Sequence, residues 1–96
     1  MTVLQQTQQL LSQYRPILAS RYPIQRLALF GSVARNEATP DSDVDILVEF
    51  SKPVGFQFLE LAHELEILLG KKVDLVSKNG IKPAYFNAIS TDLIDV

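Results

Sequence analysis

Three aspartates are the residues of this chain whose type and spacing most clearly suggest chemistry. Asp43 and Asp45 alternate with Val44 and Ile46 in a run typical of a strand, so both carboxylates are expected on one face. Two unit charges about 5 Å apart repel by roughly 3 kcal/mol at an effective dielectric constant of 20, and Asp74 nearby would add a similar cost. A divalent cation removes this repulsion, and Mg²⁺ sites combine carboxylates with phosphate oxygens. The pattern therefore indicates a metal-bound triphosphate.

A Gly-Ser pair precedes these acids. Gly31 and Ser32 follow the short apolar run 26–30, and ten residues separate them from Asp43. A strand that ends at glycine and turns into a helix directs backbone N–H groups and a hydroxyl toward one concave site, which suits phosphate oxygens. Taken alone, a Gly-Ser pair is more often a plain turn, and an Asp-x-Asp triplet is more often a solvated strand end. It is the combination that favours a nucleotide site.

A calcium loop is the other interpretation of these acids. Asp41, Asp43 and Asp45 match the first ligand positions of an EF-hand. However, Ile46 stands where that loop needs its turn glycine, Lys52 replaces the bidentate glutamate, and the surrounding run is strand-like. We therefore expect no calcium loop here.

Hydrophobic periodicity predicts the elements that must position these residues. Helical spacing covers 2–21, with Pro16 as a candidate kink, and 58–69, which Gly70 can end. Short apolar runs predict four strands, over 26–30, 43–50, 72–76 and 92–96. Shorter helical segments are expected over 33–36 and 83–89. This order predicts an α/β (α+β) fold with one small mixed sheet covered by helices.

Composition and charge narrow the class of protein. A length of 96 residues fits one domain spanning 1–96, and 47% hydrophobic with 21% charged residues is typical of a globular protein. The net charge of -2 lacks the excess of Lys and Arg with which proteins bind long nucleic acids. The lack of Cys excludes disulfides and thiolate zinc sites. No apolar run approaches the roughly 20 residues that cross a bilayer, so we expect a cytoplasmic protein with no membrane partner.

The motif between positions 31 and 45 resembles the signature of the nucleotidyltransferase superfamily, with its polymerase β-like palm fold. Gly-Ser-Val-Ala-Arg at 31–35 and Ser-Asp-Val-Asp-Ile-Leu-Val at 42–48 are similar to minimal nucleotidyltransferase (MNT) domains, the antitoxins of HEPN/MNT toxin–antitoxin modules. The resemblance extends from the first helix to the terminal strand, and Asp74 stands where such proteins carry a third acid. Asn36 departs from the family, which often has Gly there, but Asn tolerates the left-handed conformation better than most residues.

This resemblance implies a role for each residue of the motif. The catalytic and metal-binding residues would be Asp43, Asp45 and Asp74. They would hold Mg²⁺, with two ions expected at the α-phosphorus of ATP. Gly31 and Ser32 would bind the β- and γ-phosphates, and Arg35 would either steady a phosphate or pair with an acid of the loop.

The resemblance also implies a reaction and a partner. AMP would pass from ATP to a tyrosine hydroxyl of a cognate HEPN toxin, an RNase, with release of pyrophosphate, and the two proteins would form a hetero-oligomer. Asp74 would help to deprotonate the hydroxyl. Two alternatives stay open: an antitoxin that neutralises the toxin by binding alone, and transfer to a small molecule such as an aminoglycoside. Related enzymes of the latter kind hold the acceptor with an additional domain, for which 96 residues leave no room.

The remaining polar and aromatic residues are given no part in this chemistry. His63, the only histidine, is expected on the surface. The glutamates of the second long helix are predicted to form a solvated face: Glu60, Glu64 and Glu66. Tyr85 and Phe86 are expected to pack in the core, with contact to a partner as the alternative.

Overall fold

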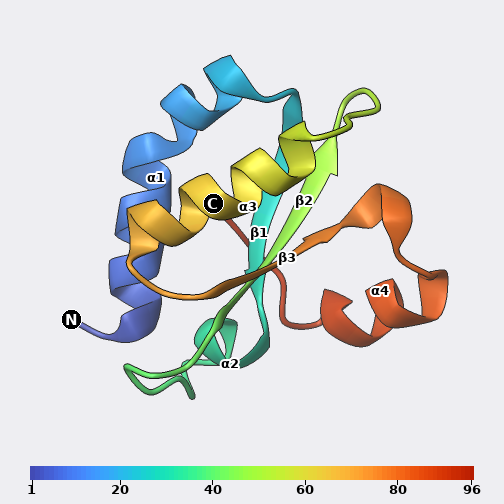
Figure 1. The fold of residues 1–96 in the computed structure, drawn as a ribbon. Helices are drawn as coiled ribbons and strands as arrows, with labels where there is room; N and C mark the ends of the chain where they lie inside the picture. The colour runs from blue at the N-terminus through green and yellow to red at the C-terminus, as the bar shows by residue number, and fades with distance from the viewer.

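The computed structural model describes residues 1–96 as helices around one four-stranded sheet (Figure 1). The helices are α1 (Val3–Arg21), α2 (Gly31–Ala34), α3 (Gln57–Leu69), the 3-10 helix η1 (Lys78–Gly80) and α4 (Pro83–Ser90). The strands are β1 (Ile24–Phe30), β2 (Val44–Phe50), β3 (Val73–Ser77) and β4 (Ile94–Asp95). The strand order is β3-β2-β1-β4, with β2 parallel to β3 and β1 antiparallel to both of its neighbours. The predicted mixed sheet is confirmed.

Each of the two long helices has a clear capping signal at one of its ends. The Gln5 N–H donates to the Thr2 hydroxyl and the Thr2 N–H donates to the Gln5 side chain, both at 3.0 Å, which is a capping box at the start of α1. The helix continues through Pro16 to Arg21. At the end of α3, Gly70 takes the left-handed conformation with φ of 64°, as expected for a glycine stop. No helix combines the length and apolar character that a membrane span requires.

The hydrophobic core lies between one face of the sheet and the pair of helices α1 and α3. Its buried members come from both helices and from β1, β2 and β3, and include Leu11, Leu18, Leu29, Ile46, Val48, Leu61 and Leu65. Because side chains alternate along a strand, the residues between these core positions point to the other face. That second face of the sheet, called the open face below, carries the motif aspartates of β2 and β3.

The connections place α3 and α4 on opposite sides of the sheet. Both β2–α3–β3 and β3–α4–β4 join parallel strands. The first connection leads from β2 to β3 at one edge of the sheet, and the second leads from β3 back across the sheet to β4 at the opposite edge. Right-handed crossovers therefore require the two helices to lie on opposite faces. Figure 1 shows α1 and α3 on one side of the strands and α4 on the other. No residue of α4 is buried, so this helix covers the open face only loosely.

Several predicted features differ from the structure. The first short helix begins at Gly31 rather than at Val33, and the last strand contains only Ile94 and Asp95, because the backbone N–H of Asp92 still bonds to the end of α4. The core position predicted for Tyr85 is wrong, since 45% of this residue is exposed. Phe86 is half-buried beneath Lys78, whose Nζ lies 5.0 Å from the ring centroid.

The predicted solvated face of α3 is only partly correct. Glu60 is exposed, as is His63. Glu64 is half-buried and pairs with Arg21 of α1, and the Glu66 carboxylate accepts the backbone N–H of Val73 at 3.0 Å. These two glutamates therefore fasten α3 to its neighbours instead of facing water.

Candidate active site

The pairing of β2 with β3 brings two of the aspartates together. Asp45 and Asp74 are direct partners in this parallel pair, and adjacent strands lie about 4.8 Å apart. Asp43 directly precedes β2, two residues from Asp45 and therefore directed to the same open face. The start of β2 is fixed by the Val44 N–H, which donates to the backbone oxygen of Lys72 at 2.9 Å. The sheet thus gathers all three predicted carboxylates at one end.

The antiparallel pair β1 and β2 brings the Gly-Ser turn to the same end. Phe30, the last residue of β1, is the partner of Asp45, so Gly31 follows directly beside that carboxylate. Gly31 has φ of 72°, and a Cβ atom at this position would lie 2.1 Å from Asp45 Oδ2. Any side chain here would displace the carboxylate, so a glycine is required both by its backbone conformation and by its neighbour.

Helix α2 and the turn after it hold the Gly-Ser segment in place. The Arg35 N–H donates to the backbone oxygen of Gly31 at 3.0 Å, and the Glu37 N–H donates to that of Ser32 at 2.9 Å. Asn36 has φ of 59°, the left-handed conformation in which the family often has glycine. Asparagine tolerates this region, so the departure from the family pattern leaves the turn intact.

The three aspartates lie in an environment without a bonded basic partner. Burial raises the pKa of the half-buried Asp45 carboxyl above its ordinary value, and the nearby Asp74 and Asp43 raise it further, while Arg35 lowers it. None of the three forms an ion pair. Their mutual repulsion is therefore left for a cation to neutralise.

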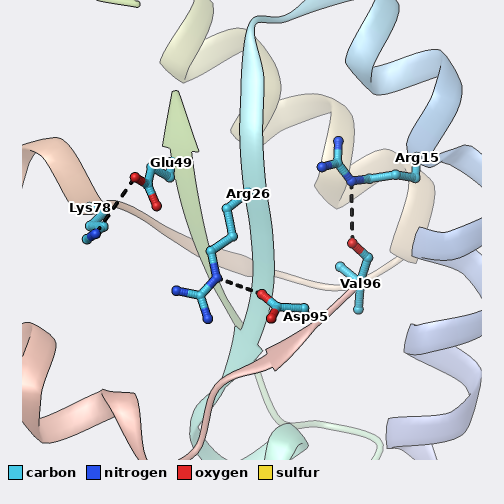
Figure 2. Close-up of polar contacts among 6 residues, drawn as sticks. All are labelled: Arg15, Arg26, Glu49, Lys78, Asp95 and Val96. Carbon is cyan, nitrogen blue, oxygen red and sulfur yellow. Dashed lines mark hydrogen bonds and ion pairs between the residues drawn. The ribbon is translucent and has the colours of Figure 1, made fainter. Parts of the chain in front are cut away.

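Acids at the other end of the open face are neutralised by the protein itself. Figure 2 shows that Arg26 Nε donates to Asp95 Oδ1 at 2.6 Å and that Lys78 Nζ lies 3.7 Å from Glu49 Oε1. Glu49 lies on β2 four residues after Asp45. The contrast within one strand sets the motif aspartates apart from ordinary surface carboxylates.

The donor set fits a magnesium ion that a nucleotide helps to bind. No group of three or more His, Asp or Glu side chains is close enough together to hold an ion by itself. Magnesium in nucleotide sites is usually bound by one or two carboxylates together with phosphate oxygens and water. The neighbours Asp45 and Asp74, with Asp43 beside them, supply carboxylate oxygens of that kind.

Arg35 makes contacts that sequence reasoning found only in part. Its Nε donates to Glu37 Oε1 at 2.6 Å, which is the predicted pairing with an acid of the loop, and its Nη1 donates to Asp92 Oδ2 at 2.8 Å. These hydrogen bonds raise the pKa of the guanidinium, which stays charged. Asp92 was not foreseen, because 57 positions separate the two residues and only the pairing of β4 with β1 brings them together.

This fold, with carboxylates on two parallel strands beside a Gly-Ser turn, is that of a nucleotidyltransferase domain. The family model described as "Nucleotidyltransferase domain" matches residues 11–94, and the chain belongs to this family. Protein adenylyltransferase MntA from Thermococcus cleftensis is 37% identical over 97 residues, covering 100% of this chain and 98% of its own. A Methanocaldococcus jannaschii protein, provisionally named a protein adenylyltransferase, is 42% identical over the whole length of both chains.

Solved structures show the same fold. A structure provisionally described as a minimal nucleotidyltransferase aligns with a TM-score of 0.77 and 33% identity over 100% of this chain and 97% of the other. An MNT antitoxin in complex with a tri-AMPylated HEPN toxin of Shewanella oneidensis aligns with a TM-score of 0.71 and 24% identity, covering 93% of this chain and 70% of the matched one. A toxin–antitoxin structure with AMP-PNP gives a TM-score of 0.74 at 24% identity, covering 86% and 69%.

Proposed function

We propose that this chain is a Mg²⁺-dependent protein adenylyltransferase that acts as an antitoxin, transferring AMP from ATP to a tyrosine hydroxyl of a cognate HEPN toxin. The observation that carries the proposal is the pair Asp45 and Asp74, side by side on parallel strands, with neither in an ion pair and with Gly31 against one carboxylate. Full-length similarity to proteins named protein adenylyltransferases supports a protein as the acceptor.

The proposed step is an in-line displacement at the α-phosphorus of ATP. The acceptor oxygen forms a bond to this phosphorus, the bond to the oxygen bridging the α- and β-phosphates breaks, and pyrophosphate leaves. The hydroxyl proton passes to a carboxylate, for which Asp74 is the candidate because it is more exposed than its half-buried neighbour Asp45. Mg²⁺ bound here would stabilise the charge that develops on the phosphate oxygens.

The other residues of the site bind and orient the nucleotide in this proposal. Asp43 and Asp45 would hold the metal ions, with Asp74 completing the set. Backbone N–H groups at Gly31 and Ser32, together with the Ser32 hydroxyl, would hold the β- and γ-phosphates. Arg35, charged and 47% exposed, would contribute to the same phosphates. These groups come from α2, from the starts of β2 and β3, or from the residues next to them, so the fold brings them together without a ligand.

Incubation of the folded chain with ATP labelled at the α-phosphate, Mg²⁺ and the partner toxin tests the proposal. We expect label and the added mass of AMP on a tyrosine of the toxin, and loss of both with Asp45→Asn. Glu49→Gln is the matched control, since it removes a carboxylate from the same strand and face without touching the motif. Toxin that stays unmodified in a folded complex would contradict the proposal. Full neutralisation by Asp43→Asn would favour the alternative of inhibition by binding alone.

A further inference from the structure

We infer that Asp92 is a positioning residue, which holds the Arg35 guanidinium beside the carboxylates so that it can bind the triphosphate. This inference rests on the proposed function and adds a residue that lies far from the motif in sequence. It depends on the pairing of β4 with β1, the two hydrogen bonds of Arg35, and the proximity of Arg35 to Asp45.

The register of β4 on β1 explains why Asp92 reaches this site. Ile94 is the partner of Leu29 in this antiparallel pair. Continuing this antiparallel register two residues forward from Leu29 and two residues back from Ile94 leads to Gly31 and Asp92, at the end of the sheet where the Gly-Ser turn begins. The backbone N–H of Asp92 donates to the oxygen of Ile89 at 3.0 Å, which also fixes this residue to the last turn of α4.

The contacts of Arg35 leave donors free for a ligand. A guanidinium has five N–H donors, and the bonds to Glu37 and Asp92 use one from Nε and one from Nη1. The remaining donors suit phosphate oxygens, which arginine binds in a planar, bidentate manner. Arg35 is held close to Asp45 by the backbone, because its N–H donates to the oxygen of Gly31 at 3.0 Å and Gly31 lies directly against the Asp45 carboxylate.

Asp92 is the less exposed of the two anchors, and the only one that comes from another part of the fold. The Asp92 side chain is 23% exposed, whereas that of Glu37 is 61% exposed and lies only two residues from Arg35 in the same turn. Less exposure to water strengthens an ion pair, because the charges are less screened. Without Asp92, the guanidinium would be held only by a neighbour two residues away, and the long side chain would lose orientation before ATP arrives.

The test is a double-mutant cycle on binding and kinetics. The Kd of ATP with Mg²⁺ is measured by calorimetry, and KM and kcat for AMP transfer are measured separately, for wild type, Asp92→Asn, Arg35→Gln and the double variant. We expect Asp92→Asn to weaken ATP binding and raise KM by about threefold to fivefold, as for the loss of one partly exposed ion pair, with a smaller change in kcat. Adding it to Arg35→Gln should change nothing further, and Asp92→Glu should recover part of the affinity.

Asp95→Asn is the matched control, because it removes a similar ion pair, at 2.6 Å to Arg26, from the same end of the chain. It should bind ATP like the wild type. The inference would be overturned if Asp92→Asn and Asp95→Asn changed the Kd of ATP equally. It would also be overturned if Asp92→Asn weakened ATP binding as much in the Arg35→Gln background as in the wild type. If the wild type binds ATP with this coupling but transfers no AMP, the proposed function fails and the inference stands. If it binds no ATP, both fail.

Discussion

Replacement of Gly31 by alanine tests the close approach on which the site depends. Gly31 has φ of 72°, where an L-residue costs about 1–2 kcal/mol. The new Cβ would also lie 2.1 Å from Asp45 Oδ2 and 3.1 Å from Asp45 Cγ, well inside the roughly 3.5–4.0 Å that carbon atoms prefer. The carboxylate would have to rotate away, and a displacement of about 1 Å in an active site can lower the rate about 100-fold.

Gly70→Ala separates the backbone effect from the collision. Gly70 has φ of 64°, but a Cβ there meets nothing within 4 Å. Backbone strain should cost both variants about 1–2 kcal/mol of unfolding free energy, and the collision in Gly31→Ala adds to this loss. Each kcal/mol corresponds to about 4–8 °C in Tm for a domain of this size. Only Gly31→Ala should lose AMP transfer. Thermal unfolding and the rate of label transfer from ATP measure the two effects.

The comparison of the two glycine variants has a clear negative result. If Gly31→Ala transferred AMP at the rate of Gly70→Ala, the position of the Asp45 carboxylate against the turn would be irrelevant to catalysis. The reasoning from the 2.1 Å approach would then be wrong.

Further predictions concern charge and packing. The pKa of the Asp45 carboxyl is raised in the folded chain. Its contribution to the unfolding free energy is therefore fully present below the ordinary carboxyl pKa and is lost as the pH rises through the raised pKa. Asp45→Asn should remove this pH dependence from denaturation curves measured without metal. Asp74→Asn should slow AMP transfer by about 100-fold or more in single-turnover assays, if Asp74 accepts the proton. Glu66→Ala should lower the unfolding free energy by about 1–2 kcal/mol in urea titrations, because the Val73 N–H loses its acceptor. In the same titrations Leu65→Ala, in the core, should cost about 2–5 kcal/mol.

The sequence was most informative where local pattern and topology agree. Alternation in 43–50 placed the aspartates on one face, and Gly31 and Gly70 marked the ends of a strand and a helix, because these signals depend on a few neighbouring residues. A strand-helix-strand unit also favours a parallel pair of strands, as seen for β2 and β3, but the register that pairs Asp45 with Asp74 comes from the structure.

Contacts between residues far apart in the sequence could not be predicted from such local signals. Helical periodicity assigned Glu64 and Glu66 to a polar face, but it does not show that Arg21 and the start of β3 lie against that face. Similarly, Tyr85 belongs to the short apolar helix α4, but its side chain is exposed. Asp92 reaches Arg35 only because the two-residue strand β4 pairs with β1. In each case the decisive information is the position of a second element, which short-range sequence spacing does not contain.

The most direct test of the central claim is a titration of the chain with Mn²⁺, in place of Mg²⁺, followed by electron paramagnetic resonance with and without a non-hydrolysable ATP analogue. We expect nucleotide-dependent binding of Mn²⁺, weakened about tenfold or more when Asp45 or Asp74 becomes asparagine and unchanged in Glu49→Gln. Binding that is unaffected by loss of Asp45, or no binding in the presence of nucleotide, would contradict a metal site formed by these aspartates.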